Sequence, residues 1–378
     1  MSFRRTRAMA RKEVLHIWRD PRSLAMALAV PVLLLFLFGT ALSLDVDRIP
    51  TLIYDADGGS GARELIHRFQ GSRFFQIRGM ASGPAEIERR IDRNEIFLGV
   101  SIPHNYSRQI AAGREAPVQI LIDGSDSNTA SIAMGYVEAL MRAYAFELRK
   151  GAQNRKGGGQ ALVIPAEARL RVWYNSQLQS KNYIVPGLIA VILMIIASLL
   201  TSLTVAREWE MGTMEQLLST PVRPAEMVLG KMLAFFGVGV IDTAIAIAVG
   251  ILFFDVPMRG NGLFLVGSSC VFLFGALFWG IFLSAAARSQ LLAFQIGMIT
   301  SFLPSFLLSG FVYAVESMPP VIRTITHLVP ARHFITVLKG IFLKGVGLEV
   351  LWVETLFLAV FAALVFVLAT RKMKQKVA

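Results

Sequence analysis

The chain has 378 residues, of which 54% are hydrophobic and 17% charged, with a formal net charge of +12 and a mean hydropathy of +0.55. Soluble domains carry about 25% charged residues, so this composition excludes an ordinary soluble protein and indicates an integral membrane protein. In such a protein, excess basic charge is typical of cytoplasmic flanks and does not by itself indicate nucleic-acid binding. The single cysteine, Cys270, excludes an intrachain disulfide and any cysteine-based metal cluster.

Residues 1–22 are strongly basic and carry a short apolar stripe. Val14, Leu15 and Trp18 fall at helical spacing opposite charged positions. This pattern predicts an amphipathic interfacial helix lying on the membrane; the alternative is a disordered basic tail.

Residues 23–44 form an apolar run of about the length that spans a bilayer. A signal peptide cleaved near Ala41 is the alternative. Because the run exceeds the usual apolar region of about 7–15 residues in signal peptides, we expect an uncleaved first span. The basic segment before it predicts a cytoplasmic N-terminus.

Residues 45–180 differ from the rest of the chain, because their apolar stretches are short and turn signals are frequent. The pattern predicts an extracytoplasmic α/β domain with alternating strands and helices, followed by a long helix over Ser125–Lys150. The expected strands are Ile49–Tyr54, Phe74–Ile77, Ile96–Ile102 and Val118–Ile122, and the expected helices between them include Arg63–Phe69 and Pro84–Arg93.

Five further apolar runs predict a fold class of six transmembrane helices, with both termini in the cytoplasm. The stretch 313–348 is only half apolar and contains three prolines, so we expect external re-entrant helices there, and residues 371–378 form a basic cytoplasmic tail. The remaining predicted spans are 181–206, 228–254, 263–287, 291–312 and 350–370.

Three polar residues within these spans are candidates for a translocation path. Asp242 lies near the centre of the third span, where a carboxylate costs several kcal/mol unless it faces protein or water. Asp242 therefore either lines the translocation path or serves as a proton site, or it forms a hydrogen bond to a neighbouring helix. Gln295 and Ser301 lie in the fifth span and could face its partners.

Residues 207–227, between the second and third spans, carry dense and nearly balanced charge. Met211, Met214 and Leu217 fall at helical spacing, and we expect Pro221 and Pro224 to stop that helix. A short amphipathic helix held at a membrane surface is suited to dock in a groove on another protein. An ordinary charged loop is the alternative.

The chain lacks the motifs of common energy-coupling and hydrolytic sites. It contains no Gly-x-x-x-x-Gly-Lys-[Ser/Thr] phosphate loop and no His-Glu-x-x-His metal motif. Ion-coupled carriers generally need several intramembrane charges, whereas Asp242 stands nearly alone. We therefore expect a protein that is not an enzyme by itself and that binds no cofactor or metal of its own.

Several motifs together resemble the type-2 ABC exporter permeases. The first motif that carries the resemblance is Arg207-Glu208-x-Glu210-x-Gly212-Thr213-x-Glu215-x-Leu217, followed by Thr220-Pro221. The other motifs are Asp123-Gly124 with Asn128–Ser131, Trp173-Tyr174-Asn175, Pro186-Gly187, Glu316–Pro319 and Leu328–Phe334. Ser176 departs from the family, which usually has proline there, and this puts the local turn geometry in doubt.

The resemblance implies a transport subunit of the bacterial inner membrane that exports a hydrophobic or amphipathic, drug-like or lipid-like substrate. ATP and Mg²⁺ would bind to a separate nucleotide-binding subunit, and a second copy or a closely similar permease would complete the dimer. A periplasmic adaptor and membrane lipids are further candidate partners, and nucleic acid is not. The residues implied to couple to the ATPase are Arg207, Glu208, Glu210, Gly212, Thr213, Glu215 and Leu217.

Two other functions compete with this interpretation. One is a proton-coupled secondary transporter that uses Asp242. Its transport would follow the proton gradient and ignore ATP. The other is a membrane receptor or anchor whose external domain binds a ligand, and it predicts no functional need for the loop at residues 207–227.

Overall fold

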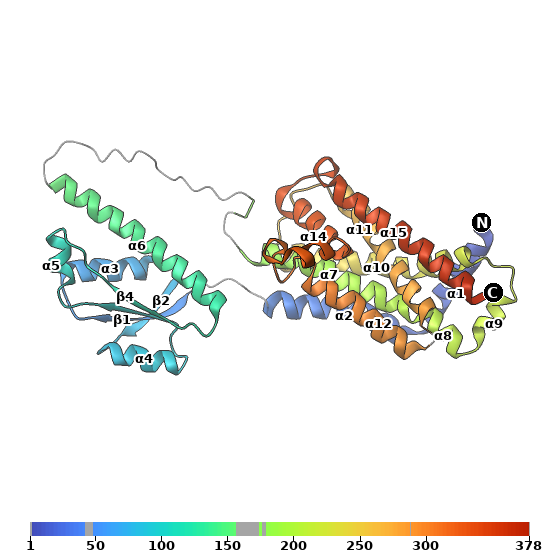
Figure 1. The fold of residues 1–378 in the computed structure, drawn as a ribbon, viewed down its shortest axis with the longest axis horizontal. Coiled ribbons are helices and arrows are strands. Elements are labelled where there is room, and N and C mark those ends of the chain that lie inside the picture. The colour runs from blue at the N-terminus through green and yellow to red at the C-terminus, as the bar shows by residue number, and fades with distance from the viewer. Residues whose placement is uncertain (1, 42–47, 156–173, 176–178, 288, 378) are drawn as a thin grey trace. The chain divides into compact units, whose positions relative to one another are not determined.

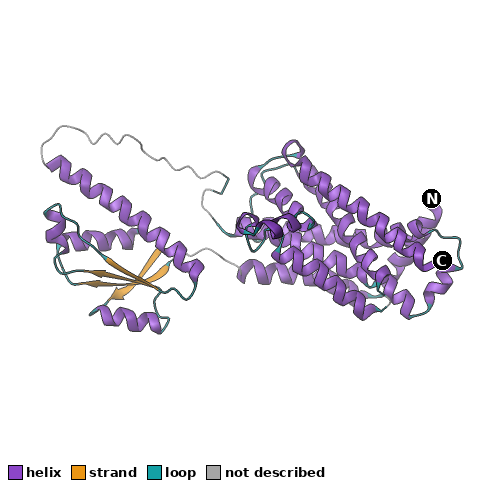
Figure 2. Ribbon diagram, in the orientation of Figure 1, coloured by secondary structure: helices purple, strands orange, loops and turns teal. Residues whose placement is uncertain are grey.

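The computed structural model describes residues 2–41, 48–155, 174–175, 179–287 and 289–377. The chain divides into two compact units, a helical unit of Met1–Ser43 with Val172–Ala378 and a sheet unit of Leu44–Arg171. Figures 1 and 2 show the helices and strands of each unit. Trp173 belongs to one of the motifs that resemble the family, and Ser176 is the position that departs from it; both lie outside the described residues.

The sheet unit is built on four strands in the order β2-β1-β3-β4. The strand β1 pairs in parallel with β2 and β3, whereas β3 and β4 are antiparallel. Each strand lies within about two residues of its expected position, except that β2 continues three residues beyond Ile77. The strands are β1 (Ile49–Asp55), β2 (Phe75–Met80), β3 (Leu98–Ile102) and β4 (Gln119–Ile122).

Helices cover both faces of this sheet (Figure 1). One apolar core joins the sheet to three helices through Phe69, Tyr106 and Val137, and a second, smaller core joins Leu52 to Ile87. The first core uses α3 (Ser60–Gly71), α5 (Tyr106–Ala111) and α6 (Ser127–Arg155), and the second uses α4 (Pro84–Asp92).

Six helices of the helical unit are long and apolar enough to cross a membrane, counting the described residues only. In the most apolar stretch of the α7–α8 run, 78% of the residues are buried, against 17–61% in the other five spans. Four of those spans pack around α7, whereas the last span packs against two of the four. The helices are α2 (Pro21–Ala41), α7 (Lys181–Ser202) with α8 (Thr204–Glu210), α10 (Pro224–Leu252), α11 (Gly262–Ala286), α12 (Gln290–Leu307) and α15 (Leu348–Val377).

Glycine allows the central helices to approach closely. A Cβ atom added at Gly280 of α11 would lie 2.0 Å from Thr201 Oγ1 and 2.2 Å from the Ser198 carbonyl oxygen, both on α7. The same short approach lets the Thr201 hydroxyl donate to the Leu277 carbonyl of α11, at 3.0 Å. Small residues at helix contacts are a general feature of membrane bundles.

Several helix ends differ from the expected bounds. Pro224 is the first residue of α10, so it starts a helix, where the sequence analysis expected it to stop one; proline is well tolerated at a first helical position. The helix α12 ends at Leu307, short of 312, and α15 continues through the expected tail to Val377. The predicted end of the first span at residues 42–44 lies outside the described residues.

The segment after α12 consists of short helices, none longer than ten residues. Pro320 and Pro330 are the first residues of α13 and α14, and Pro319 directly precedes α13. Phe334 of α14 stacks on Phe272 of α11 with the ring centroids 4.1 Å apart. Nearby, the Tyr183 hydroxyl donates to the Gly310 carbonyl at 2.7 Å. These elements are η1 (Val315–Ser317), α13 (Pro320–Thr326), α14 (Pro330–Lys339) and the π-helix η2 (Gly340–Lys344).

Candidate functional site

The charged loop forms two short helices at the end of the helical unit where both chain termini lie (Figure 1). We call this end the termini end. The helix α8 stops at Glu210, and α9 (Thr213–Leu218) follows after Gly212, whose φ is +69°. The helical spacing of Met211, Met214 and Leu217 predicted one continuous helix here. Glycine adopts a left-handed conformation at little cost and therefore commonly ends helices.

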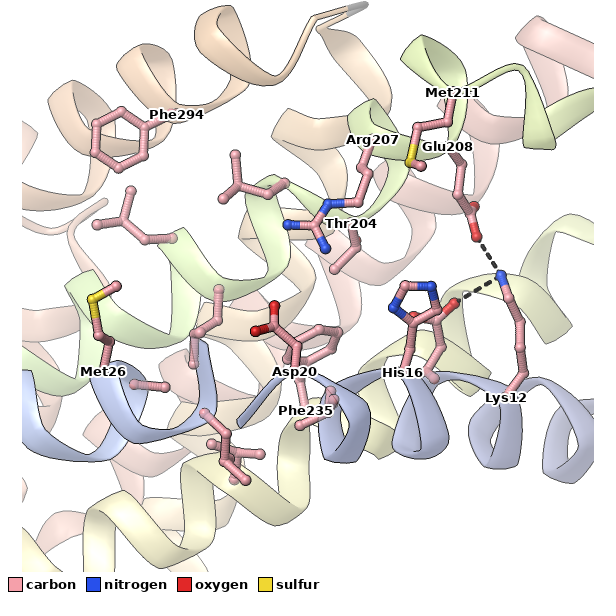
Figure 3. A pocket seen from close by; sticks show the side chains of 18 of the residues that line it. Lys12, His16, Asp20, Met26, Thr204, Arg207, Glu208, Met211, Phe235 and Phe294 are labelled. Carbon is pink, nitrogen blue, oxygen red and sulfur yellow. Dashed lines mark hydrogen bonds and ion pairs between the residues drawn. The ribbon is translucent and has the colours of Figure 1, made fainter. Parts of the chain in front are cut away.

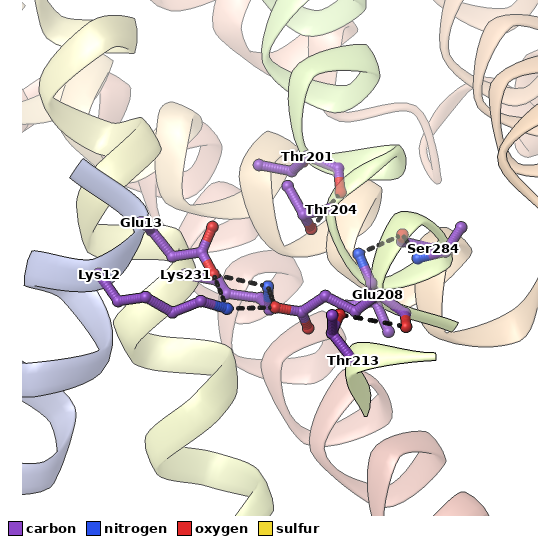
Figure 4. Close-up of polar contacts among 10 residues, drawn as sticks. Lys12, Glu13, Thr201, Thr204, Glu208, Thr213, Lys231 and Ser284 are labelled. Atoms are coloured by element: carbon purple, nitrogen blue, oxygen red, sulfur yellow. Dashed lines mark hydrogen bonds and ion pairs between the residues drawn. The ribbon is translucent and has the colours of Figure 1, made fainter. Parts of the chain in front are cut away.

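A buried serine of α11 fixes the start of α8. The backbone N–H groups of Val205 and Ala206 both donate to Ser284 Oγ, at 2.9 and 3.0 Å. Helix starts leave such N–H groups without intrahelical partners, and Ser284 is fully buried. The hydroxyl therefore holds α8 in place relative to α11 where the chain leaves α7 (Figure 4).

Four charged side chains from three helices form a closed ring beside α8 (Figure 4). Lys12 and Glu13 come from the N-terminal helix α1 (Phe3–Arg19), Glu208 from α8 and Lys231 from α10. We call this group the ionic ring. Its nitrogen–oxygen distances are 2.5 Å for Lys12–Glu208, 3.0 Å for Glu208–Lys231, 2.8 Å for Lys231–Glu13 and 3.3 Å for Glu13–Lys12.

Three members of the ionic ring are buried, because Lys231 is 1% exposed and Glu13 and Glu208 are each 7% exposed. The fourth member, Lys12, is exposed and borders the pocket of Figure 3, so solvent reaches the ring on that side. Burial alone would raise the pKa of Glu13, but the charges and hydrogen bonds of Lys231 and Lys12 together outweigh burial and lower it. Burial alone would likewise lower the pKa of Lys12, and the contact with Glu208 raises it instead. The contribution of Glu13 to stability is thus present above its ordinary pKa and is lost as pH falls through the lowered value.

A second group of contacts ties α1 to the start of α10. Glu226 is fully buried and accepts from the Ser2 backbone N–H at 2.6 Å, and it forms an ion pair with Arg5 at 3.0 Å. Arg5 also donates to the Pro221 carbonyl at 2.5 Å. With the ionic ring, these contacts fasten α1 along α8, α10 and the turn between α9 and α10.

Glu210 joins α8 to the first turn of α12. Its carboxylate accepts from the Gln290 backbone N–H at 2.7 Å and from the Gln290 side-chain amide. Arg207 donates to the same amide's oxygen at 3.3 Å. Gln290 is the first residue of α12, and an anionic group at a helix start is favourable. Movement of α8 is therefore linked directly to α12.

The residues implied to couple to an ATPase occupy different environments in the structure. Glu208 is buried in the ionic ring. Thr213 is half-buried, and its hydroxyl donates to the Glu208 carbonyl at 3.4 Å. Arg207 and Leu217 are also half-buried, and the exposed members are Glu210, Gly212 and Glu215.

The three candidate pathway residues do not lie together in one site. Asp242 is 2% exposed, and its Oδ1 forms no hydrogen bond with the described residues. Ser301 is fully buried and donates to Ser198 of α7 at 2.7 Å, whereas Gln295 is exposed. Ser301 thus forms an interhelical hydrogen bond.

Several members of this site were not predicted from the sequence. Lys12, Glu13 and Lys231 were not identified, although Lys231 near the start of an apolar span signals a buried partner. Ser284 and Gln290 gave no signal, because a single serine or glutamine at a helix end is common. Among the described residues no group of three or more His, Cys, Asp or Glu side chains is arranged to hold a metal ion. What these contacts can do is transmit movement between helices.

Comparison with known proteins places the whole chain in one family. Residues 21–371 match the family model described as ABC-2 family transporter protein. The chain is 35% identical, over all of its length and 98% of the relative's, to the probable multidrug ABC transporter permease YbhS of Escherichia coli (strain K12). It is 34% identical to the probable multidrug ABC transporter permease YbhR of the same strain, over 93% of each chain. It is 26% identical to that strain's inner membrane transport permease YhhJ, over 87% of this chain and 86% of the relative. The chain belongs to the ABC-2 family of transporter permeases.

Proposed function

We propose that the chain is the permease subunit of an ATP-driven exporter that moves a hydrophobic or amphipathic, drug-like or lipid-like molecule out of a bacterial cell. A separate nucleotide-binding subunit would bind ATP and Mg²⁺ and hydrolyse the ATP. The observation that carries this proposal is the α8–α9 element. It presents the exposed Glu215 and is linked to α1, α10, α11 and α12. The printed names of the two multidrug permeases favour the same function.

The orientation that we propose places both termini and α8–α9 in the cytoplasm. Six spans return the chain to its starting side, and both termini lie at the same end of the helical unit as α8 and α9. Basic residues concentrate in α1, as expected of a cytoplasmic flank. In this orientation residues 45–180 face the periplasm and the membrane is the inner membrane.

The proposed mechanism begins with docking of the partner ATPase on α9 around Glu215. Closure of two ATPase subunits around ATP would move α9 and α8 together. Glu208 would carry the movement to α1 and α10 through the ionic ring, and Glu210 would carry it to α12 through Gln290. ATP shifts such an equilibrium only through contacts that differ between the two arrangements of the helices.

The permease would act as a pair, either as a homodimer or with a closely similar permease. The similarity of this chain to two permeases of one strain, at 35% and 34% identity, supports a partner of the same kind. A periplasmic adaptor that meets the sheet unit would extend the path outward.

A second candidate function rests on Asp242. Its carboxylate is almost fully buried, and its Oδ1 has no hydrogen-bond partner among the described residues. A buried carboxylate in a span is a candidate proton site. The chain would then be a proton-coupled secondary transporter.

Drug uptake into inside-out vesicles distinguishes the two functions. We expect uptake that requires ATP, survives a protonophore and persists in Asp242→Asn. Uptake that is driven by a proton gradient without ATP and lost in Asp242→Asn would overturn the exporter proposal. A receptor or anchor predicts no uptake, and no effect of substitutions in residues 207–227 on the ligand binding of the external domain.

A further inference from the structure

The long helix α6 of the sheet unit has one buried face and one exposed face. Ala133, Val137 and Tyr144 belong to the first apolar core and are at most 6% exposed. Away from that core, Met134 is 52% exposed and Phe146 is 44% exposed. Large apolar side chains that gather on an exposed surface commonly mark a contact with a partner. Among the described residues, this side of α6 is therefore a candidate interaction surface.

Small residues and one pair of opposite charges complete the exposed side of α6. Gly135 and Ala145 are exposed, and a Cβ atom added at Gly135 would meet nothing within 4 Å. Glu138 and Arg142 are also exposed and form an ion pair one helical turn apart, at 3.0 Å. We call this group the outer face of α6; its members are Met134, Gly135, Glu138, Arg142, Ala145 and Phe146.

The order of these residues along the helix makes the outer face self-complementary. Consider a second copy of α6 that runs in the opposite direction and crosses the first at about position 140. Phe146 then lies level with Gly135 of the second copy, because the two residues are nearly equally distant from that position. By the same rule Glu138 lies level with Arg142 of the second copy, and Met134 with Ala145. A two-fold axis repeats each of these contacts.

We propose that α6 binds a second copy of this chain, and that the two helices pack antiparallel through their outer faces. Phe146 fills the open space over Gly135 of the second copy, and Met134 covers Ala145. A large side chain opposite a small one lets two helices approach closely, since the distance between helix axes depends on the side chains at the contact. The pairing of two permeases belongs to the proposed function, and this surface goes beyond it by placing a contact in the sheet unit.

The charges decide the direction of the two helices. In a symmetric parallel pair, Glu138 would face Glu138 of the second copy and Arg142 would face Arg142, and like charges that face each other across an interface repel. In the antiparallel pair each carboxylate meets a guanidinium of the other copy as well as its partner within the helix. The four charges then alternate in sign.

Crosslinking of the full-length chain in membranes tests this register. In a Cys270→Ser background, Met134→Cys and Ala145→Cys are made separately and together, and the membranes are treated with a short bis-maleimide. The two positions are about 16 Å apart along one helix, which such a reagent does not span. We expect crosslinked dimers from the double variant and from co-expressed single variants, and none from either single variant alone. Dimers from each single variant would indicate parallel helices, and no dimer from any combination would reject the interface.

A pair of glycine variants tests the contact of Phe146 with Gly135. Gly135→Leu in the double-cysteine protein occupies the space for Phe146 and should abolish the crosslink. The matched control Gly151→Leu also lies on α6 in open space, but outside the outer face, and should leave the crosslink unchanged. Thermal unfolding should show that both proteins are folded. A crosslink that persists in Gly135→Leu would contradict the proposal.

Exchange of the two charges tests the polar contact. In the double-cysteine protein, Glu138→Arg makes the outer face positive and Arg142→Glu makes it negative, so each variant should lose the crosslink with itself. A chain with Glu138→Arg and Met134→Cys, co-expressed with a chain that carries Arg142→Glu and Ala145→Cys, regains opposite charges between the copies. We expect this mixed pair to regain the crosslink, and its failure to do so would overturn the proposal.

The same membranes distinguish failure of this surface from failure of the exporter function, because ATPase activity that co-purifies with the chain is measured alongside the crosslink. Crosslinked dimers without an ATPase would keep the surface and contradict the exporter proposal. ATPase activity without a crosslink between copies would reject the surface and leave the exporter proposal standing. A crosslink from Met134→Cys to a protein of a different mass would assign the outer face to another partner and would also reject the proposal.

Discussion

Lys231 illustrates how a single charged side chain holds several helices together. It is 1% exposed and contacts Glu13 of α1 at 2.8 Å and Glu208 of α8 at 3.0 Å. Buried ion pairs add little net stability compared with apolar side chains, but removing one partner leaves an uncompensated buried charge. The ionic ring therefore fixes an arrangement of helices more than it raises stability.

We predict that Lys231→Met lowers the free energy of unfolding by about 3–5 kcal/mol. In this variant the two buried carboxylates, Glu13 and Glu208, keep Lys12 as their one remaining cation in the ionic ring, so one buried negative charge is not compensated. Thermal unfolding of the purified protein measures the loss. The double variant Glu208→Gln/Lys231→Met should recover part of it, since it removes one of the stranded charges. Lys344→Met, at an exposed lysine, is the matched control. A Lys231→Met protein as stable as that control would contradict the assignment.

The break at Gly212 gives α8 and α9 their separate directions. Its φ is +69°, and a Cβ atom added there would meet nothing within 4 Å, so any penalty for a larger residue comes from the backbone alone. A left-handed conformation costs a non-glycine residue roughly 1–2 kcal/mol. Gly237 of α10 also has open space but lies within a regular helix.

We predict that Gly212→Ala loosens α9, so that backbone amides of Thr213–Leu218 exchange hydrogen about 5–30 times faster, in line with the conformational cost. Hydrogen–deuterium exchange with mass spectrometry measures the rates. The control Gly237→Ala should leave α9 unchanged. Unaltered exchange in Gly212→Ala would show that the break does not depend on glycine.

Long apolar periodicity was the reliable part of the sequence analysis. It located the six runs and the four strands of the sheet unit, since such patterns reflect burial over many residues. The ends were less accurate, because α12 ends at Leu307 and α15 continues to Val377. The short helices were less predictable: Gly212 divides one expected helix, and Pro224 begins the next. The ionic ring joins residues about 200 positions apart, so no local pattern indicated that Lys12 meets Glu208.

Across the molecule, the termini end gathers the elements to which our proposal assigns coupling. The helices α8 and α9 and both chain termini lie at this end of the helical unit (Figure 1). The comparisons fix the family, whereas the substrate and the partner ATPase are part of our proposal. The proposed orientation can be tested without knowing either.

We predict opposite accessibility for two introduced cysteines in a Cys270→Ser background. Cysteine at the exposed His67 of the sheet unit should react with a membrane-impermeant maleimide in spheroplasts. Cysteine at the exposed Gln216 of α9 should react only after the membrane is permeabilised. The reverse pattern would invert the proposed topology and remove α9 from the reach of a cytoplasmic ATPase.

Glu215 offers the sharpest probe of coupling, because it is exposed and forms no described side-chain hydrogen bond, whereas Glu210 also holds the start of α12. The decisive measurement is ATPase activity that co-purifies with the permease from detergent-solubilised membranes. We predict that the native chain retains an ATPase subunit, that Glu215→Lys loses it while its thermal stability stays unchanged, and that Lys344→Glu retains it. Full retention of the ATPase by a folded Glu215→Lys protein would contradict coupling through α9. A stable native chain that co-purifies without any ATPase would contradict the exporter proposal and favour an Asp242-dependent carrier or a receptor.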